Sequence, residues 1–302
     1  MTRITNNIII NDFMKNYRES SRRLNKYMNQ LSNGAKFSQI SDNAIDAAKS
    51  LKLETTIKFN NQYADNAETG IRWLAITDQA LDDVVKTLRR IRDIAVKGAN
   101  GTWTNNERAK MQEEVEQIKK HLIEIGNSKY GDRYIFNGTK TKIKPYKDGN
   151  TINPADYLDS GTISQAQIKR EIFEGSIVEI NISGKDVGNG GFSQIFADLK
   201  ELSNSLATGD IPGINNSISK IDQHIEKTLA ARARVGARQQ RLELVKTRLE
   251  TQEVEYSKIL SNTKDVDIPE TIMKLKNEEN VYRAALAVGA RIIMPSLINF
   301  LK

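Results

Sequence analysis

The chain has 302 residues and a formal net charge of +7; 38% of its residues are hydrophobic and only 6% are aromatic. A charged fraction of 27% with so few aromatic residues is typical of long helical bundles, whose surface is large relative to their core. Because the chain has no cysteine, disulfides, thiolate chemistry and cysteine-bound zinc are excluded.

The first predicted element is a helix over about residues 8–31. Its apolar residues recur every seven positions, as Ile10, Tyr17, Leu24 and Leu31. This spacing keeps them on one side of a helix, where they need a partner helix to become buried. Asn33-Gly34 is predicted to end the helix, because Gly34 can adopt the positive φ of a C-cap.

The excess of positive charge lies largely on this first helix. Residues 1–60 contain ten Lys and Arg against five Asp and Glu. A basic amphipathic helix is able to contact nucleic acid or an anionic membrane. Here the basic residues are not interleaved with stacking aromatics and form no known nucleic-acid motif. We therefore interpret the charge as a solvated helix face, with neither nucleic acid nor a membrane as partner.

A polar connector follows, in which Ser41 or Asp42 is predicted to cap a long second helix. Between residues 74 and 95 of that helix, apolar residues recur at spacings of three, four or seven positions, and the helix is predicted to end near Gly98. Thr104, with Glu107 three residues on, has the spacing of a capping box and begins a third helix.

Near residue 130 the chain changes from helical periodicity to turns and alternation. Residues 130–190 contain the turn pairs Asp148-Gly149 and Asn153-Pro154 and an alternating stretch at 177–183. We predict a small β-rich domain here, inserted between two helical halves. Helices then resume, a short one over 192–206 and a long one over 214–259.

The last helix is separated from the others by a helix-breaking segment at 261–269. Pro269 suits the first turn of this helix, and Pro295 kinks or ends it. Its apolar row consists of Ile272, Leu275, Tyr282, Leu286 and Ile293, interrupted only by Glu279 and Gly289. The two ends of the chain thus carry unpartnered stripes. We expect the ends to pair with each other or with the ends of neighbouring copies, and to be mobile in the free monomer.

The predicted fold is mainly α with an inserted β domain, an elongated helical bundle or coiled coil. Residues 1–40 with 266–302 form terminal coiled-coil segments, whose nine stripe residues are the predicted assembly interface. Residues 41–140 with 192–265 form the helical bundle domain. Residues 141–191 form the small β-rich domain.

No constellation of catalytic or ligand-binding residues is apparent. The two histidines, His121 and His224, lie in helical patterns and have no second His, Cys or carboxylate pair at metal-ligand spacing. Asp265 and Asp267 lack the further oxygen ligands of a calcium loop, so we expect them to cap a helix or shape a turn. We predict that the chain is no enzyme and needs neither cofactor nor metal.

Several long stretches carry a family resemblance. LSNGAKFSQISDNAIDAAKSLKLE at 31–54 and RIRDIAVKGANGTWT at 90–104 resemble the flagellins and flagellin-like hook-associated proteins of bacteria. Three more are similar to the hook-associated protein 3 branch, the proteins of the hook–filament junction. These are IRWLAITDQALDDV at 71–84, GDRYIFNGTKT at 131–141 and VYRAALAVGARIIMPSLINFLK at 281–302.

The resemblance implies a fold in which terminal helices form an inner tube, the bundle forms its wall and the β domain faces outward. It implies a structural role in motility, as an adaptor ring of identical copies that joins hook-associated protein 1 to flagellin. It also implies an extracellular place in the flagellum, reached through type III export with an export chaperone and without a cleaved signal peptide. The N-terminus has no signal-peptide layout, and no run approaches the ~20 apolar residues of a membrane span.

Two other functions stay open. The chain is alternatively a filament flagellin subunit, which polymerises rather than adapts. A second alternative is a basic coiled-coil protein that binds nucleic acid. Binding driven by phosphate contacts weakens steeply with salt, so a salt-titrated DNA-binding assay separates this second alternative from the others.

Overall fold

The computed structural model describes residues 2–101, 103–146 and 166–293. Within them the chain is mainly helical, and its strands form two two-stranded sheets. It folds as two compact units, the first from Met1–Phe59 with Gln252–Lys302 and the second from Asn60–Thr251. The predicted fold class, mainly α with a small β insertion, is confirmed.

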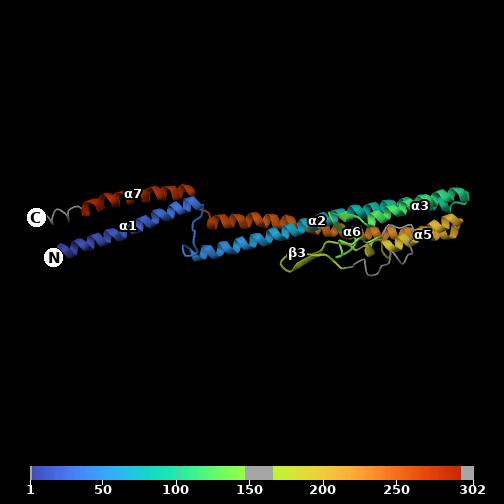
Figure 1. Ribbon diagram of the computed structural model, residues 1–302, viewed down its shortest axis with the longest axis horizontal. Helices are drawn as coiled ribbons and strands as arrows, with labels where there is room; N and C mark the ends of the chain where they lie inside the picture. The colour runs from blue at the N-terminus through green and yellow to red at the C-terminus, as the bar shows by residue number, and fades with distance from the viewer. Residues whose placement is uncertain (1, 102, 147–165, 294–302) are drawn as a thin grey trace. The chain divides into compact units, whose positions relative to one another are not determined.

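The first unit contains the two ends of the chain. Helix α1 (Thr2–Asn33) and helix α7 (Ile268–Ile293) lie side by side (Figure 1). The first part of helix α2 (Ala44–Ala99) and the last part of helix α6 (Ile211–Lys264) complete the unit. Helix α1 ends at Asn33 as predicted, and Gly34 has the positive φ of 67° that this end requires.

The cap of helix α2 is not the one predicted. Asn43 precedes the helix, and its Oδ1 accepts the N–H three residues on at 3.2 Å. Asp42 instead accepts the N–H groups of residues 38 and 39, each at 3.2 Å, and so shapes the connector. Ser41 hydrogen-bonds within the connector as well. All three residues have side chains that can cap a helix, so the backbone path decides which one does.

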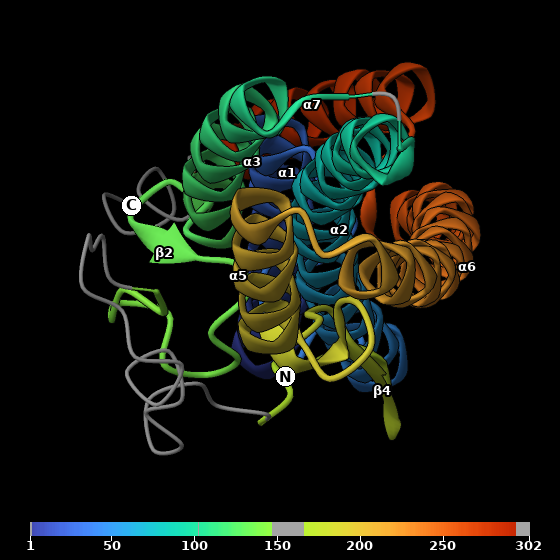
Figure 2. The same cartoon turned by 90° about the vertical axis from the view of Figure 1, so that its right-hand side faces the viewer.

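The second unit is a helical bundle around an apolar core. The remaining turns of α2 and α6 pack with helix α3 (Asn105–Gly126) and helix α5 (Phe192–Thr208), seen end-on in Figure 2. The fully buried core residues include Leu74, Leu81, Leu88, Leu122, Phe192, Phe196, Val235 and Leu242. The predicted capping box of Thr104 and Glu107 begins α3. The periodically spaced apolar residues of these helices therefore form an intramolecular core.

Two antiparallel hairpins and one short 3₁₀ turn cover part of this bundle. Strand β1 (Lys129–Tyr130) pairs with β2 (Arg133–Tyr134). Strand β3 (Lys169–Phe173) pairs with β4 (Ser176–Glu179), with Arg170 opposite Val178, and the turn η1 spans Gly184–Asp186. The predicted turns at 148–149 and 153–154 lie outside the described residues, as does Pro295. The division into three domains therefore stays a prediction.

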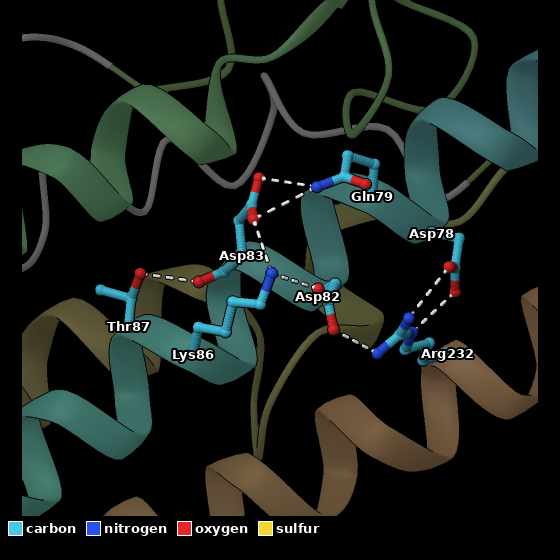
Figure 3. A network of polar contacts seen from close by, with 7 residues as sticks. All are labelled: Asp78, Gln79, Asp82, Asp83, Lys86, Thr87 and Arg232. Atoms are coloured by element: carbon cyan, nitrogen blue, oxygen red, sulfur yellow. Dashed lines mark hydrogen bonds and ion pairs between the residues drawn. The ribbon is translucent and has the colours of Figure 1, made fainter.

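Charged side chains join α2 to α6 in the second unit (Figure 3). Arg232 of α6 donates to Asp78 at 2.8 and 3.2 Å and also pairs with Asp82 of α2. Lys86 pairs with Asp82 at 2.7 Å, and this hydrogen bond is the main reason that the pKa of Asp82 is lowered. Because these side chains are partly exposed, water and salt screen the network. Its contribution to the free energy of unfolding is therefore modest.

A buried polar network joins α5 to α6. His224 is 2% exposed and Asp198 is 5% exposed. His224 Nδ1 accepts the backbone N–H of Asn189 at 2.9 Å, which leaves Nε2 to donate to Asp198 at 2.7 Å. Burial alone would raise the pKa of Asp198, but donors from His224, Lys220 and Gln194 outweigh it and leave the pKa lowered. His224 thus has a structural role.

Candidate assembly surface on the terminal helices

Helices α1 and α7 pair in an antiparallel manner, which is one of the two arrangements that their stripes predicted. At one level the Phe13 ring lies against Gly289. A methyl group on Gly289 would lie 2.8 Å from Cε1 of Phe13 and closer still to Cζ. Only a glycine therefore lets the ring approach α7 at this level. Gly289, which interrupts the apolar row in the sequence, is a buried contact point.

The next level is a pair of tyrosines. The rings of Tyr17 and Tyr282 stack with centroids 5.2 Å apart, and their hydroxyl oxygens are 2.6 Å apart. The hydrogen bond to Tyr282 is the main cause that raises the pKa of Tyr17. The pair thus combines apolar contact with one polar bond, which suits a partly buried position.

A charged contact follows one turn further along. Ser20 is buried, and its hydroxyl donates to Glu278 at 2.9 Å. Arg23 donates to the same carboxylate oxygen at 3.0 Å through Nε and lies 2.9 Å from it through a terminal nitrogen. The hydrogen bond from Arg23 is the main cause that lowers the pKa of Glu278. The carboxylate is therefore held ionised within the seam of the pair.

Backbone bonds tie the two connectors together where the helices of this pair meet α2 and α6. Ala35 forms an isolated antiparallel bridge with Asp265. The N–H of Lys36 donates to the carbonyl of Lys264 at 2.7 Å, and the N–H of Val266 donates to Gly34 at 2.9 Å. Asp267 caps α7 by accepting the N–H of residue 270 at 3.0 Å, which confirms its predicted capping role.

The predicted stripe residues lie on or beside this seam. The half-buried ones are Ile10, Tyr17, Leu24, Leu31, Leu275 and Tyr282. Ile272 is 44% exposed and Leu286 is 47% exposed, because both lie at the edge of the contact face of α7. The side chain of Ile293 lies outside the described part of the chain. As an interface with other copies, these nine residues stay a prediction, as does the mobility of the helices in the monomer.

Sequence reasoning missed the polar members of the seam: Ser20, Arg23 and Glu278. An apolar-stripe search passes over them because it counts hydrophobic residues alone. Their spacing could have identified them, because residues three and four positions apart lie on the same face of a helix. Ser20 follows Tyr17 by three residues and precedes Leu24 by four. Glu278 holds the matching place between Leu275 and Tyr282.

Several large apolar side chains of the two helices are also exposed to solvent. On α1 and α7 the exposed ones are Ile8, Ile9, Met28, Ile268, Ile272, Met273, Val281, Leu286 and Val288. Ile268, Ile272 and Leu286 share one face of α7, because their separations are close to whole numbers of helical turns. Concentrations of exposed apolar side chains mark surfaces that a partner covers.

Two other kinds of site are absent from the described residues. None of their helices has the length and hydropathy needed to cross a membrane. In the same residues, no three His, Cys, Asp or Glu side chains gather as metal ligands would.

Comparison with known proteins identifies the family. Residues 4–141 match the bacterial flagellin N-terminal helical region, and residues 218–301 match the bacterial flagellin C-terminal helical region. The chain belongs to the flagellin-like family. It is accordingly a structural protein of the bacterial flagellum, and its family is not enzymatic.

Relatives of this flagellin-like chain are distant but nearly full-length. The flagellar filament 31.3 kDa core protein of Treponema maltophilum is 24% identical over 88% of this chain and 87% of that protein. A flagellin of Bacillus subtilis is 24% identical over 96% of this chain and 95% of that protein.

Solved structures share its fold. A putative flagellar hook-associated protein from Vibrio parahaemolyticus has a TM-score of 0.65 and 21% identity, covering 74% of this chain and 100% of that one. Bacillus cereus FlgL has a TM-score of 0.57 and 21% identity, covering 70% of this chain and 99% of that one.

Proposed function

We propose that this flagellin-like chain is an adaptor at the hook–filament junction, joining hook-associated protein 1 to flagellin as a ring of identical copies. The observation that carries the proposal is how two of the junction-type stretches meet. Trp73, from the stretch at 71–84, contacts Tyr130 edge-on with ring centroids 5.8 Å apart and an angle of 77°. Tyr130 ends strand β1 and directly precedes the stretch at 131–141, in which Ile135 and Phe136 are fully buried. The junction-type residues therefore build one packed element.

The terminal helices supply the means of assembly. Their outward apolar residues, among them Ile272 and Leu286, are available to neighbouring chains of the ring, to hook-associated protein 1 and to flagellin. We propose that the chain reaches this extracellular position through the type III export channel, with an export chaperone and without a cleaved signal peptide.

A filament subunit is the second candidate. It is favoured by the curated relatives, which are themselves flagellins and filament core proteins. The nucleic-acid alternative has no support from the family.

Immunogold electron microscopy of cells with and without the gene tests the two candidates. An adaptor gives label at one point, where hook meets filament, and its deletion leaves hooks without filaments and sheds flagellin into the medium. Label along the whole filament would show that the chain is a filament subunit and would overturn the proposal.

Substitutions in the complementing gene test the assembly surface. Leu286→Asp is expected to change the monomer's melting temperature little and to abolish assembly, because Leu286 is 47% exposed at the edge of the α1–α7 contact. Leu244→Asp is the matched control: Leu244 is 69% exposed on α6 and lies outside the surface, so assembly should persist. Loss of assembly in both variants, or in neither, would contradict the assignment of the surface.

A further inference from the structure

Four asparagines of the chain are followed directly by glycine: Asn33, Asn100, Asn137 and Asn189. Such a pair can lose its amide without an enzyme. The backbone nitrogen of the glycine attacks Cγ of the asparagine, a succinimide ring closes and ammonia leaves. Glycine favours this attack because it has no side chain beside that nitrogen. Water then opens the ring, and the product is aspartate or isoaspartate.

Three of the four asparagines are held away from this reaction. Asn137 is fully buried, and its amide nitrogen donates to two backbone carbonyls at 2.9 and 3.1 Å. The amide nitrogen of Asn189 donates to the side chain of Gln223 at 3.0 Å. Asn33 is the last residue of α1, and its backbone must leave the helical conformation before its Cγ can reach the next nitrogen.

Asn100 lies instead in the loop between α2 and α3. Both Asn100 and Gly101 are exposed to solvent, and neither belongs to a helix or a strand. Loop backbone rotates at a lower free-energy cost than the backbone of a packed helix, so ring closure is easier here. Among the four pairs, Asn100-Gly101 is therefore the one expected to lose its amide first.

A buried arginine contacts the backbone carbonyl of Asn100. Arg108 is 6% exposed, and one of its terminal nitrogens donates to this carbonyl at 3.3 Å. Its Nε donates to the carbonyl of Gly98 at 3.2 Å, and its other terminal nitrogen donates to the side chain of Asn105 at 3.3 Å. All three acceptors are neutral. A carboxylate in place of one of them would form a stronger, charge-assisted bond.

This contact bears on the way in which the succinimide opens. The ring has two carbonyls, the former backbone carbonyl of Asn100 and its former side-chain carbonyl. Attack of water on the former backbone carbonyl frees it as a carboxylate and leaves the chain running through the side chain, which is isoaspartate. Arg108 donates to the oxygen of this same carbonyl, so it stabilises the negative charge that develops there during the attack. The contact therefore favours isoaspartate over aspartate.

We propose that Asn100 is a modification site, which the folded chain converts to isoaspartate while Arg108 directs the opening of the ring. Over the two steps, one water is consumed and one ammonia is released, and no oxidant or reductant takes part. The loop gains one negative charge and one extra backbone atom. The inference goes beyond the proposed function and holds equally for an adaptor and a filament subunit.

Incubation of the full chain at neutral pH, followed by peptide mapping with mass spectrometry, tests the site. Isoaspartyl methyltransferase labels isoaspartate and so separates the two products. Modification is expected at Asn100 before the other three asparagines. The ratio of isoaspartate to aspartate at Asn100 should be about twofold or more above that of the same chain unfolded in guanidinium chloride. Earlier modification of another Asn-Gly pair, or an equal ratio in the folded and unfolded chains, would refute the proposal.

Gly101→Ala tests the attacking nitrogen. The added methyl group meets no atom within 4 Å, and Gly101 does not have a positive φ, so the fold should be retained. The methyl group crowds the nitrogen, and modification of Asn100 should be slowed about tenfold. An unchanged rate in this variant would show that the amide is lost by another route.

Arg108→Gln tests the direction of ring opening. Asn100 should still lose its amide, but the ratio of isoaspartate to aspartate should fall to that of the unfolded chain. Lys110→Gln is the matched control, because it removes the same charge from an exposed position of α3 and should leave the ratio unchanged. If circular dichroism shows that Arg108→Gln does not fold, Arg108→Lys replaces it with the same expected direction, since lysine lacks the planar fork of donors. An unchanged ratio in the folded Arg108 variant would contradict the role of this residue.

Discussion

Replacing Gly289 by alanine should loosen the α1–α7 pair and leave the second unit intact. The new methyl group would lie 2.8 Å from one Phe13 ring atom and 3.3 Å from another, so the ring must leave its place or α1 must move away. Overpacking of this kind costs about 1–3 kcal/mol, and alanine recovers about 1 kcal/mol through its higher helix propensity. A net loss of about 1 kcal/mol remains.

Amide hydrogen exchange measures this loss segment by segment. A change of about 1 kcal/mol corresponds to roughly fivefold faster exchange in α1 and α7. Gly236→Ala is the control, because Gly236 lies within α6 and its added methyl group meets no atom within 4 Å. That variant should gain about 1 kcal/mol in α6 and leave exchange in α1 and α7 unchanged.

A double-mutant cycle ties the effect to the ring. If Phe13 is the obstacle, Gly289→Ala should cost less in a Phe13→Ala background, with a coupling of at least about 0.5 kcal/mol. Exchange in α1 and α7 that is as slow in Gly289→Ala as in the unchanged chain would refute the packing argument. Fast exchange in both forms would instead support the predicted mobility of the terminal helices.

Three further predictions follow from polar groups of the two units. Tyr17→Phe removes the hydrogen bond to the Tyr282 hydroxyl and should speed amide exchange in the pair by about two- to fivefold. Changing both tyrosines to phenylalanine should destabilise the pair little more than changing one, because no hydroxyl is then left unpaired. The pKa of Glu278 is lower in the folded pair than its unfolded value of 4.5, so the ionised carboxylate stabilises the pair. This stabilisation is fully present at pH values above the unfolded pKa. It is lost as the pH falls through the lower, folded pKa. Protection factors of the pair should therefore drop in acid, and Glu278→Gln should weaken the pair at neutral pH and remove that part of the drop. His224→Ala leaves Asp198 with fewer donors in a buried site and should lower the free energy of unfolding of the second unit by about 1–3 kcal/mol, measured by urea denaturation.

The helices and several of their ends were predictable because their signals are local. Seven-residue spacing, the Asn33-Gly34 end and the Thr104–Glu107 capping box each depend on a few neighbouring residues. The cap of α2 was predicted wrongly because residues 41–43 all carry capping side chains, and the connector's own hydrogen bonds select among them.

The candidate surface was harder to predict because pairing selects for shape as well as hydrophobicity. In the sequence, Gly289 interrupts the row of apolar residues. In the structure, the absence of a side chain at Gly289 makes room for the Phe13 ring. From the sequence alone, Glu278 would be expected to be a solvent-exposed charge. In the structure, Ser20 and Arg23 of α1 donate hydrogen bonds to its carboxylate. Neither partner can be identified until α1 and α7 are placed side by side.

The polar contacts between α1 and α7 permit a single axial alignment of the two helices. Because the apolar residues of α1 repeat every seven positions, sliding one helix by a repeat would again set apolar against apolar. That slide would separate the hydroxyls of Tyr17 and Tyr282 by about 10 Å, at 1.5 Å per residue, and would leave Glu278 without Ser20 and Arg23. A polar layer excludes such offsets at a modest loss of stability, as a buried asparagine does in a coiled coil. The exposed side chains of α1 and α7 therefore have fixed positions relative to one another along the pair.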